Sequence, residues 1–243
     1  MSDIAPVSLR GRTVLVTGAS RGIGAAVARR LAASGARVAL LARDKEALRV
    51  LTKEIGGGAV ALACDVRDTA TLKRAIDQLP ALIGGAPDLI VNNAGAFFIT
   101  PAQDTTVEAF ADTLAVNLTA PFAVVRALLP AFRQRGNGHV VTIGSIADRV
   151  TFPGNAAYAA SKHGLRALHQ VLREELRSSG VRVSLVSPGP VNTDLWNPID
   201  PDQQLGFTPR AAMLSADAVA DAVHYVVTAP ASLNVDELRL SRA

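Results

Sequence analysis

Short apolar runs rich in β-branched residues alternate with longer helical segments along almost the whole chain. This alternation is typical of β-α-β units, in which each helix returns the chain so that the next strand pairs in parallel. It predicts an α/β fold, a doubly wound parallel sheet of about seven strands with helices on both faces. The expected strands are residues 13–17, 37–41, 59–64, 89–92, 139–144, 182–187 and 235–240, and the expected helices are residues 23–33, 45–55, 69–79, 107–135, 156–178 and 216–227.

A glycine-rich turn lies between the first expected strand and the first expected helix. Residues 17–24 place their glycines as Gly-x-x-x-Gly-x-Gly, directly after an apolar run and before a helical one. Such a turn lets the backbone approach a pyrophosphate at the helix N-terminus. The spacing differs from the common Gly-x-Gly-x-x-Gly, but the strand–turn–helix context predicts a dinucleotide site.

Tyr158 and Lys162 are four residues apart in a segment of helical periodicity, which puts them on one helix face. An ammonium beside a phenol favours the phenolate and lowers the phenol's pKa. A phenol tuned in this way can pass a proton to a carbonyl oxygen. The alternative is a chance helical pair. Chemistry is favoured because the chain holds only 2 tyrosines and uses arginine almost wherever it needs a cation.

Together with further motifs, these features resemble the short-chain dehydrogenase/reductase family in its compact single-domain branch, from about Gly11 to the C-terminus. The further motifs are Asn92-Asn93-Ala94-Gly95, Asn117, Ser145, and Pro188-Gly189 followed by Thr193. The resemblance implies a Rossmann-like sheet and an enzyme that transfers hydride between a nicotinamide and a carbonyl or secondary alcohol. A cofactor-bound sensor or scaffold without turnover is the alternative from another functional class.

The resemblance implies roles for four catalytic residues. Tyr158 would be the general acid in reduction and the base in oxidation, and Ser145 would position the carbonyl oxygen. Lys162 would hold the nicotinamide ribose and depress the tyrosine pKa. Asn117 would hold a water that relays protons to Lys162.

The resemblance also implies the cofactor contacts. Asp65 and Val66 would meet adenine, residues 92–95 the adenosine ribose, and residues 188–193 the nicotinamide carboxamide. The full set is Gly18, Ser20, Arg21, Gly22, Ile23, Gly24, Arg43, Asp65, Val66, Asn92, Ala94, Gly95, Tyr158, Lys162, Pro188, Gly189, Val191 and Thr193.

The end of the second expected strand predicts NADP(H) rather than NAD(H). Relatives that prefer NAD usually place an acid where this chain has Ala42. The next residue, Arg43, can meet a 2′-phosphate, and Arg21 can approach it from the glycine turn. Asp44 could instead be the ribose acid, but it stands where the N-cap of the next helix is expected.

Composition excludes several other classes of function. The net charge of +4 comes from scattered arginines without a basic run, so no nucleic-acid partner is expected. Cys64 is the single cysteine, and the 4 histidines have no ligand spacing, so neither an internal disulfide nor a metal is expected. We find no signal segment and no apolar stretch long enough to span a bilayer, which predicts a cytoplasmic protein without a membrane partner.

The expected organisation is a flexible N-terminal tail over residues 1–9 and a single Rossmann-fold oxidoreductase domain over residues 10–243. Residues 195–213 carry three prolines and weak periodicity, which indicates a mobile substrate lid. The helices 107–135 and 156–178 are apolar on several faces, which predicts a homodimer or homotetramer.

The resemblance implies a small carbonyl or alcohol compound as the expected substrate, with a 3-oxoacyl thioester as the alternative. The ending of the chain lacks the Asp-Gly-Gly of acyl-carrier-protein reductases, and Ser179 precedes Gly180 where those enzymes carry a basic docking residue. Both differences favour small-molecule carbonyl reductases. An apolar pocket is expected from Phe97, Phe98, Ile146, Phe152, Leu195, Trp196 and Phe207.

Overall fold

The computed structural model describes residues 7–243, which contain one seven-stranded sheet in the order β3-β2-β1-β4-β5-β6-β7. Every neighbouring pair is parallel. This confirms the predicted α/β class, with strand bounds within two residues of those expected. The strands are β1 (Thr13–Thr17), β2 (Arg37–Ala42), β3 (Val60–Ala63), β4 (Leu89–Asn92), β5 (Gly138–Ile143), β6 (Val181–Pro188) and β7 (Glu237–Leu240).

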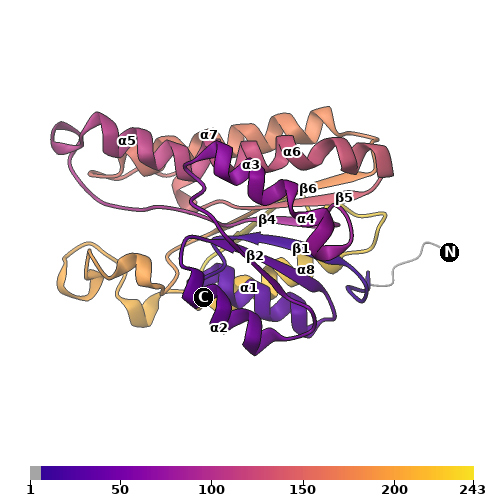
Figure 1. The fold of residues 1–243 in the computed structure, drawn as a ribbon. Coiled ribbons are helices and arrows are strands. Elements are labelled where there is room, and N and C mark those ends of the chain that lie inside the picture. The colour runs from indigo at the N-terminus through magenta and orange to yellow at the C-terminus, as the bar shows by residue number, and fades with distance from the viewer. Residues whose placement is uncertain (1–6) are drawn as a thin grey trace.

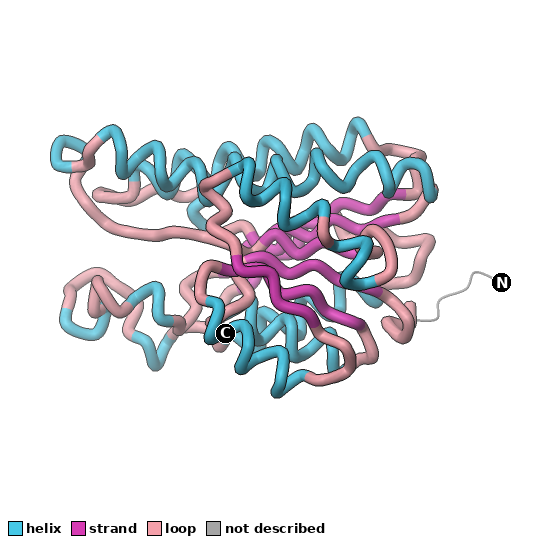
Figure 2. Tube along the Cα trace, viewed as in Figure 1, coloured by secondary structure: helices cyan, strands magenta, loops and turns pink. Residues whose placement is uncertain are grey.

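Helices cover the sheet in two layers (Figure 1, Figure 2). One layer holds α1 (Gly22–Ala33), α2 (Lys45–Ile55) and α8 (Ala216–Thr228), and the other holds α3 (Thr69–Asp77), α4 (Leu79–Ile83), α5 (Val107–Leu114), α6 (Ala120–Arg135) and α7 (Ala156–Glu175). Alternate strand residues enter opposite cores: Val14 and Val16 pack on the first layer and Leu15 on the second. Because both faces are buried, the strands read as continuous apolar runs.

The helix predicted over residues 107–135 contains a π-helical turn, Ala115–Thr119, between α5 and α6. Pro121 has no N–H, so it cannot donate to the carbonyl of Asn117 four residues earlier, and its ring would clash there in a regular helix. The wider turn relieves this clash and places Asn117 at the irregularity.

By length and composition alone, the segment Val107–Arg135 could cross a membrane, and 33% of its most apolar stretch is buried. This corrects the expectation that no apolar stretch is long enough. Core helices of folded proteins meet the same criterion. In this fold α6 packs against α3 and the sheet.

Two other helix ends differ from the prediction. The helix expected over residues 69–79 ends at Asp77, and a short helix, α4, follows it. Pro80 explains the break, because its ring would clash with the carbonyl of Ile76 in a continued α3. Helix α7 ends at Glu175 rather than at residue 178, where Ser178 has a positive φ of 64°.

Residues 7–9 of the predicted flexible tail and the predicted lid lie at opposite ends of the sheet (Figure 1). Residues 1–6 of the tail fall outside the described residues. The rest is anchored: Leu9 is 5% exposed in the core, and the Val7 N–H donates to the Thr228 carbonyl at 2.8 Å. The prediction of a loose tail is therefore wrong for residues 7–9, because an apolar side chain and a backbone bond hold them. The lid segment contains three 3₁₀ turns, Asp194–Trp196, Pro201–Gln203 and Arg210–Ala212.

Candidate active site

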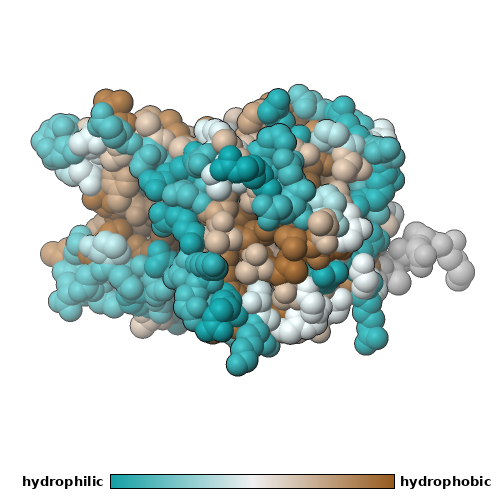
Figure 3. Space-filling model, in the orientation of Figure 1, coloured by the Kyte–Doolittle hydropathy of each residue, from teal (hydrophilic) through white to brown (hydrophobic). Residues whose placement is uncertain are grey.

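A cavity of about 1140 Å³ runs along the carboxyl ends of the strands. Open parallel sheets bind ligands at this edge, where the strand order reverses, here between β1 and β4. In Figure 3, brown and tan apolar surface lines the recess between the upper helical layer and the projecting lid segment. Most of the predicted site residues line this cavity. Those that do not are Gly24, Asn92 and Asn117.

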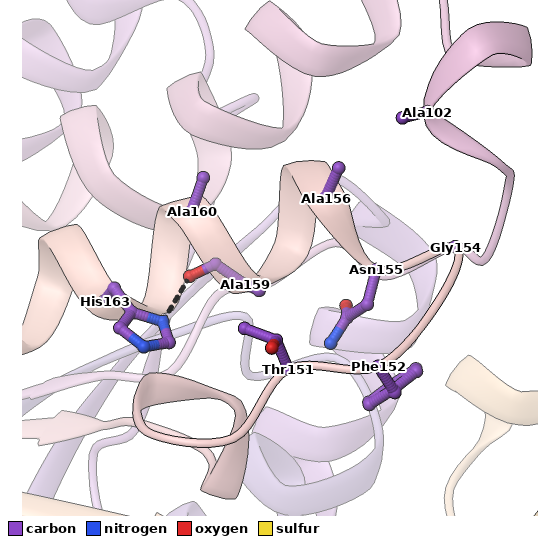
Figure 4. A pocket seen from close by; sticks show the side chains of 9 residues that line it. All are labelled: Ala102, Thr151, Phe152, Gly154, Asn155, Ala156, Ala159, Ala160 and His163. Atoms are coloured by element: carbon purple, nitrogen blue, oxygen red, sulfur yellow. Dashed lines mark hydrogen bonds between the residues drawn. The ribbon is translucent and has the colours of Figure 1, made fainter.

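A second cavity, of about 410 Å³, lies beside the start of α7 (Figure 4). Its wall includes Thr151, Asn155 and His163, and the His163 ring is 2.9 Å from the Ala159 carbonyl through Nδ1. None of the residues predicted to act in catalysis or cofactor binding lines it. The larger cavity is therefore the candidate site.

The glycine turn after β1 is fixed by contact with the end of β4. A Cβ atom on Gly18 would lie 2.7 Å from Ala94 Cα, and one on Gly24 would lie 2.3 Å from the Gly18 carbonyl oxygen. Asn93 Nδ2 donates to the carbonyls of Thr17 and Gly18 at 3.0 and 3.2 Å. Only glycine fits at these two positions, because backbone atoms occupy the space of a side chain.

Asn93 is a site residue that the sequence prediction missed. Asn92 was predicted instead, but its side chain is buried away from the cavity, whereas Asn93 lines it. The doublet at a strand end was the available signal. Successive strand residues point to opposite faces, so only one of Asn92 and Asn93 can face the cavity. The sequence does not say which one, because it does not fix the last residue of β4.

The N-terminus of α1 opens toward the cavity through this glycine turn. Its N-cap residue, Arg21, makes no side-chain cap, and no acid stands in the first helical turn. The first N–H groups of α1 and the positive end of its dipole therefore have no side-chain acceptor. Gly22 and Ser20 line the cavity beside them. This arrangement fits the pyrophosphate of a dinucleotide.

Arg21 and Arg43 are both exposed and line the same part of the cavity. Asp44, the alternative ribose acid, accepts from the Ala47 N–H at 2.9 Å and caps α2. The N-cap prediction for Asp44 is thus confirmed. The two arginines line the cavity from the turn after β1 and from the end of β2, and such cations suit a phosphate more than a neutral hydroxyl.

Asp65 and Val66 follow β3 and line the cavity as predicted. A third residue, Arg67, donates to the Asp65 carboxylate at 2.7 Å and to Asp112 of α5 at 2.9 Å. The bond to Arg67 holds the pKa of Asp65 below its usual value. Arg67 thus ties the loop after β3 to α5 across the cavity mouth, a contact between distant segments that no local pattern predicts.

Ser145, Tyr158 and Lys162 lie together in the cavity wall. Ser145 follows β5 and caps a 3₁₀ turn by accepting from the Ala147 N–H at 3.1 Å. Tyr158 and Lys162 share one face of α7, with Lys162 Nζ 5.7 Å from the tyrosine ring centroid. Lys162 Nζ donates to the Ile143 carbonyl at 2.9 Å, which orients the ammonium behind the phenol.

The pKa of Tyr158 is raised, opposite to the direction predicted from the Tyr–Lys pair alone. Burial raises this pKa most, a hydrogen bond with the Ser145 side chain lowers it, and the Asp148 charge raises it. Burial also lowers the pKa of Lys162 to about 8, against an opposing effect of Asp148. Desolvation is therefore the largest cause for both groups; the Asp148 charge adds to it for Tyr158 and opposes it for Lys162.

Asp148 is a fully buried carboxylate that the sequence prediction missed. Its Oδ2 accepts from the Ser187 hydroxyl at 2.6 Å, and its Oδ1 accepts from Arg149, which also pairs with Glu237 of β7. A polar loop residue gives no sign of burial in the sequence, because Ser187, which bonds to it, comes from the distant strand β6, and Glu237 of β7 holds its neighbour Arg149. The finding adds a fixed negative charge behind Tyr158 and Lys162.

Asn117 is fully buried and bonds two segments of the site. Its Oδ1 accepts from the Ala96 N–H at 2.8 Å, and its Nδ2 donates to the Ala96 carbonyl and to Ser161 Oγ, both at 2.9 Å. The side chain thus joins the loop after β4 to α7. Its main-chain carbonyl lacks the regular helical donor because of Pro121.

Aromatic side chains extend from Tyr158 toward the lid segment. Phe97 contacts Tyr158 edge-on with ring centroids 4.8 Å apart, and Trp196 contacts Phe97 in the same way at 5.0 Å. Phe207 lies 6.2 Å from Trp196 but outside the cavity wall. The other residues of the expected apolar pocket line it: Phe98, Ile146, Phe152 and Leu195.

Within residues 7–243 there is no group of three or more His, Cys, Asp or Glu side chains suited to a metal ion. Cys64 is buried, and burial raises the pKa of its thiol.

Comparison with known proteins gives one family. The model of the short chain dehydrogenase family matches residues 12–204. The chain is 34% identical over 232 residues to D-threitol dehydrogenase of Mycolicibacterium smegmatis (93% of this chain, 89% of the relative). It is 32% identical over 225 residues to the 3-oxoacyl-[acyl-carrier-protein] reductase FabG of Escherichia coli (91% and 92%).

Solved structures agree with this result. A metagenomic short-chain oxidoreductase in complex with NADP superimposes with a TM-score of 0.83 at 36% identity, covering 98% of this chain and 99% of the other. A closed form of serine dehydrogenase complexed with NADP⁺ superimposes with a TM-score of 0.86 at 31% identity, covering 94% of each chain.

Proposed function

The chain belongs to the short-chain dehydrogenase/reductase family, an oxidoreductase family, and from this premise we propose that it is an NADP(H)-dependent carbonyl reductase or alcohol dehydrogenase. The observation that carries the proposal is one cavity that joins an uncapped helix N-terminus to Ser145, Tyr158 and Lys162. Bound NADP(H) would supply or accept the hydride.

Tyr158 is the proton donor to the carbonyl oxygen in reduction and the acceptor in oxidation. Its raised pKa keeps the phenol protonated at neutral pH, which suits the donor role. Ser145, which lines the same cavity as the phenol, places the carbonyl oxygen. Lys162 lies behind Tyr158 and takes part in holding the nicotinamide ribose.

Asn117 contributes in two ways to this proposal. Its side chain holds the Ala96 loop against α7, so its removal would loosen the helix that carries Tyr158. The main-chain carbonyl of Asn117, rather than its fully bonded amide, holds the water that relays protons to Lys162. Pro121, which follows the π-helical turn, supports this assignment because it leaves the carbonyl without its usual donor.

NADP(H) is the preferred cofactor in this proposal. The support is the pair of exposed arginines, Arg21 and Arg43, together with the capping role of Asp44. Solved relatives bound to NADP point the same way. The remaining predicted contacts, from Gly18 to Thr193, line the cavity between these arginines and Tyr158, apart from Gly24 and Asn92.

The decisive experiment is a kinetic assay of the purified full chain with NADPH and NADH against a panel of ketones and aldehydes. We expect NADPH oxidation that depends on the carbonyl compound, with a higher kcat/KM for NADPH than for NADH. A protein that binds NADPH tightly but reduces no member of a broad panel would support the sensor or scaffold alternative.

A 3-oxoacyl thioester reductase is the second candidate. The similarity to FabG of Escherichia coli favours it, whereas Ser179 in place of a basic docking residue does not. Acetoacetyl-CoA belongs in the same panel for this reason. A kcat/KM for acetoacetyl-CoA far above that for simple ketones would replace the first proposal with the second.

We propose a homodimer or homotetramer built on α5 to α7. Val107, Phe122 and Val171 lie on these helices with 78%, 47% and 52% of their surface exposed, as expected of an apolar face that packs on a second copy. A monomer mass by light scattering at micromolar concentration would contradict this. Cytoplasmic localisation and the absence of nucleic-acid and membrane partners remain predictions for fractionation experiments.

A further inference from the structure

The wall of the cavity next to Tyr158 is made of aromatic rings at fixed positions. Phe97 meets Tyr158 edge-on at 4.8 Å, and Trp196 meets Phe97 at 5.0 Å. Phe97 and, beyond it, Trp196 therefore line the cavity beside the phenol that the carbonyl group must reach. Edge-on geometry leaves ring faces available to a further flat or apolar group.

Trp196 is held in place by the lid segment. Its Nε1 donates to the Val191 carbonyl at 3.1 Å, so the indole has its polar partner and presents only apolar surface to the cavity. Arg210 fixes the base of the lid by donating to the side-chain oxygens of Asn192 and Asn197 at 3.0 and 2.8 Å. The aromatic wall is therefore built in advance of substrate binding.

Charges in this part of the cavity disfavour an acidic substrate. Among the described residues that line the cavity, Lys162 is the cationic side chain on α7, the helix that carries Tyr158. Its ammonium already donates to the Ile143 carbonyl. Asp194, in the same 3₁₀ turn as Trp196, places an exposed carboxylate at the rim. A substrate carboxylate here would lose water, gain no partner and meet a like charge.

Building on the proposed function, we infer that the substrate is an uncharged ketone, or the matching secondary alcohol, with an aryl or similarly bulky apolar group beside the reacting carbon. The apolar group packs on Phe97 and Trp196 while Ser145 and Tyr158 meet the oxygen. Carboxylate-bearing compounds such as amino acids and sugar acids are excluded by the same wall.

A matched pair of ketones tests the charge requirement. 4′-Methylacetophenone and 4-acetylbenzoate share the acetyl group and nearly the same shape, but only the second is charged at neutral pH. With NADPH as cofactor, we expect kcat/KM to be at least about tenfold higher for the uncharged ketone. Equal or reversed values would overturn the inference while the proposed function stands.

The fluorescence of Trp196, the single tryptophan of the chain, reports binding without turnover. With NADP⁺ present, we expect 4′-methylacetophenone to change the emission at concentrations about tenfold below those needed for 4-acetylbenzoate. Binding with this preference but no reduction would remove the proposed function and keep the ligand class. Absence of any response to the uncharged ketone at its solubility limit would overturn the ligand class.

Variants of the wall provide the second test. Phe97→Ala should lower kcat/KM for 4′-methylacetophenone by about tenfold, and for the small 2,3-butanedione by less than about threefold. Tyr225→Ala, a truncation of an exposed ring on α8, is the control and should change neither value. An equal loss for both substrates in Phe97→Ala would mean that Phe97 only supports Tyr158, which contradicts the inference.

Discussion

The two ends of the cavity are built on different physical principles. At the ends of β1 and β2 the ionisable groups Arg21 and Arg43 are exposed, and the backbone of the glycine turn defines the shape. At the end of β5 and β6 the ionisable groups, Asp148 and Lys162, are buried and bonded to neighbours. One end suits recognition of a charged ligand in water, and the other suits proton transfer away from water.

This difference shows at which end of the cavity burial changes the pKa of an ionisable group. Exposed arginines act through Coulomb attraction, which salt screens. Burial moves the pKa of Lys162 down to about 8 and the pKa of Tyr158 up. Substitutions at the two ends should therefore fail in different ways, in cofactor choice at one end and in turnover or its pH dependence at the other.

The largest effect is expected from Tyr158→Phe. The variant lacks the hydroxyl that transfers the proton, so kcat should fall by about 10²–10⁴-fold. The dissociation constant of NADPH, measured by fluorescence titration, should change little because the ring is kept. A kcat within threefold of the parent would remove Tyr158 from the mechanism and with it the distinction between the two ends.

Arg43→Ala should affect cofactor choice. Losing a charge-assisted contact with the 2′-phosphate should weaken NADPH binding by about tenfold to a hundredfold, with little effect on NADH. Arg49→Ala, an exposed arginine of α2 paired with Glu46, is the matched control. Equal weakening of both cofactors in Arg43→Ala would place Asp44, not Arg43, at the centre of ribose recognition.

His139 is a buried ionisable group outside the cavity, and it tests how burial alone affects stability at different pH values. It lies in β5 beside Ser184, and burial lowers its pKa to about 3. As pH falls below 6.5 the unfolded chain binds a proton that the folded chain does not, so folding should lose about 1.4 kcal/mol for each pH unit down to about pH 3.

Urea unfolding at pH 7, 6 and 5 measures this loss. His139→Gln cannot titrate, so its stability should fall less steeply with pH than that of the parent. A slope that remains unchanged would show that His139 is protonated in the folded protein. His169, whose pKa burial lowers to about 4, supplies the residual slope.

Of these substitutions, Asp148→Asn should change the rate at neutral pH least. It should clearly change the pH profile of that rate. Asp148 raises the pKa of both Tyr158 and Lys162, so removing its charge lowers both. Reduction needs both groups protonated, and the alkaline limb of kcat/KM should therefore move to lower pH.

Ser187→Ala is the matched control for Asp148→Asn. It removes the bond to Asp148 Oδ2 and keeps the charge. If both variants shift the alkaline limb equally, Asp148 acts through structure alone. A shift of the Asp148→Asn limb to higher pH would contradict the electrostatic account.

The sequence predicted the sheet well because buried parallel strands are apolar on both faces and glycine turns are local. Pro80 and Pro121 changed the helices, since a ring that is tolerated in a first turn breaks the regular helix before it. Tyr158 and Lys162 could be found by spacing. Asp148 could not, because its buried partner Ser187 lies on β6 and only the folded sheet brings the two together. The pKa of Tyr158 was predicted in the wrong direction for the same reason, since desolvation is a property of the fold.

The lid segment has a consequence for protein engineering. Its tip carries Leu205, whose surface is fully accessible, followed by Gly206 with a positive φ of 88°. Arg210 fastens the base of the same segment to Asn192 and Asn197. A short peptide tag inserted between Leu205 and Gly206 should therefore be displayed outside the molecule while the aromatic wall keeps its place. That would give a handle for immobilising the protein beside its own cavity mouth.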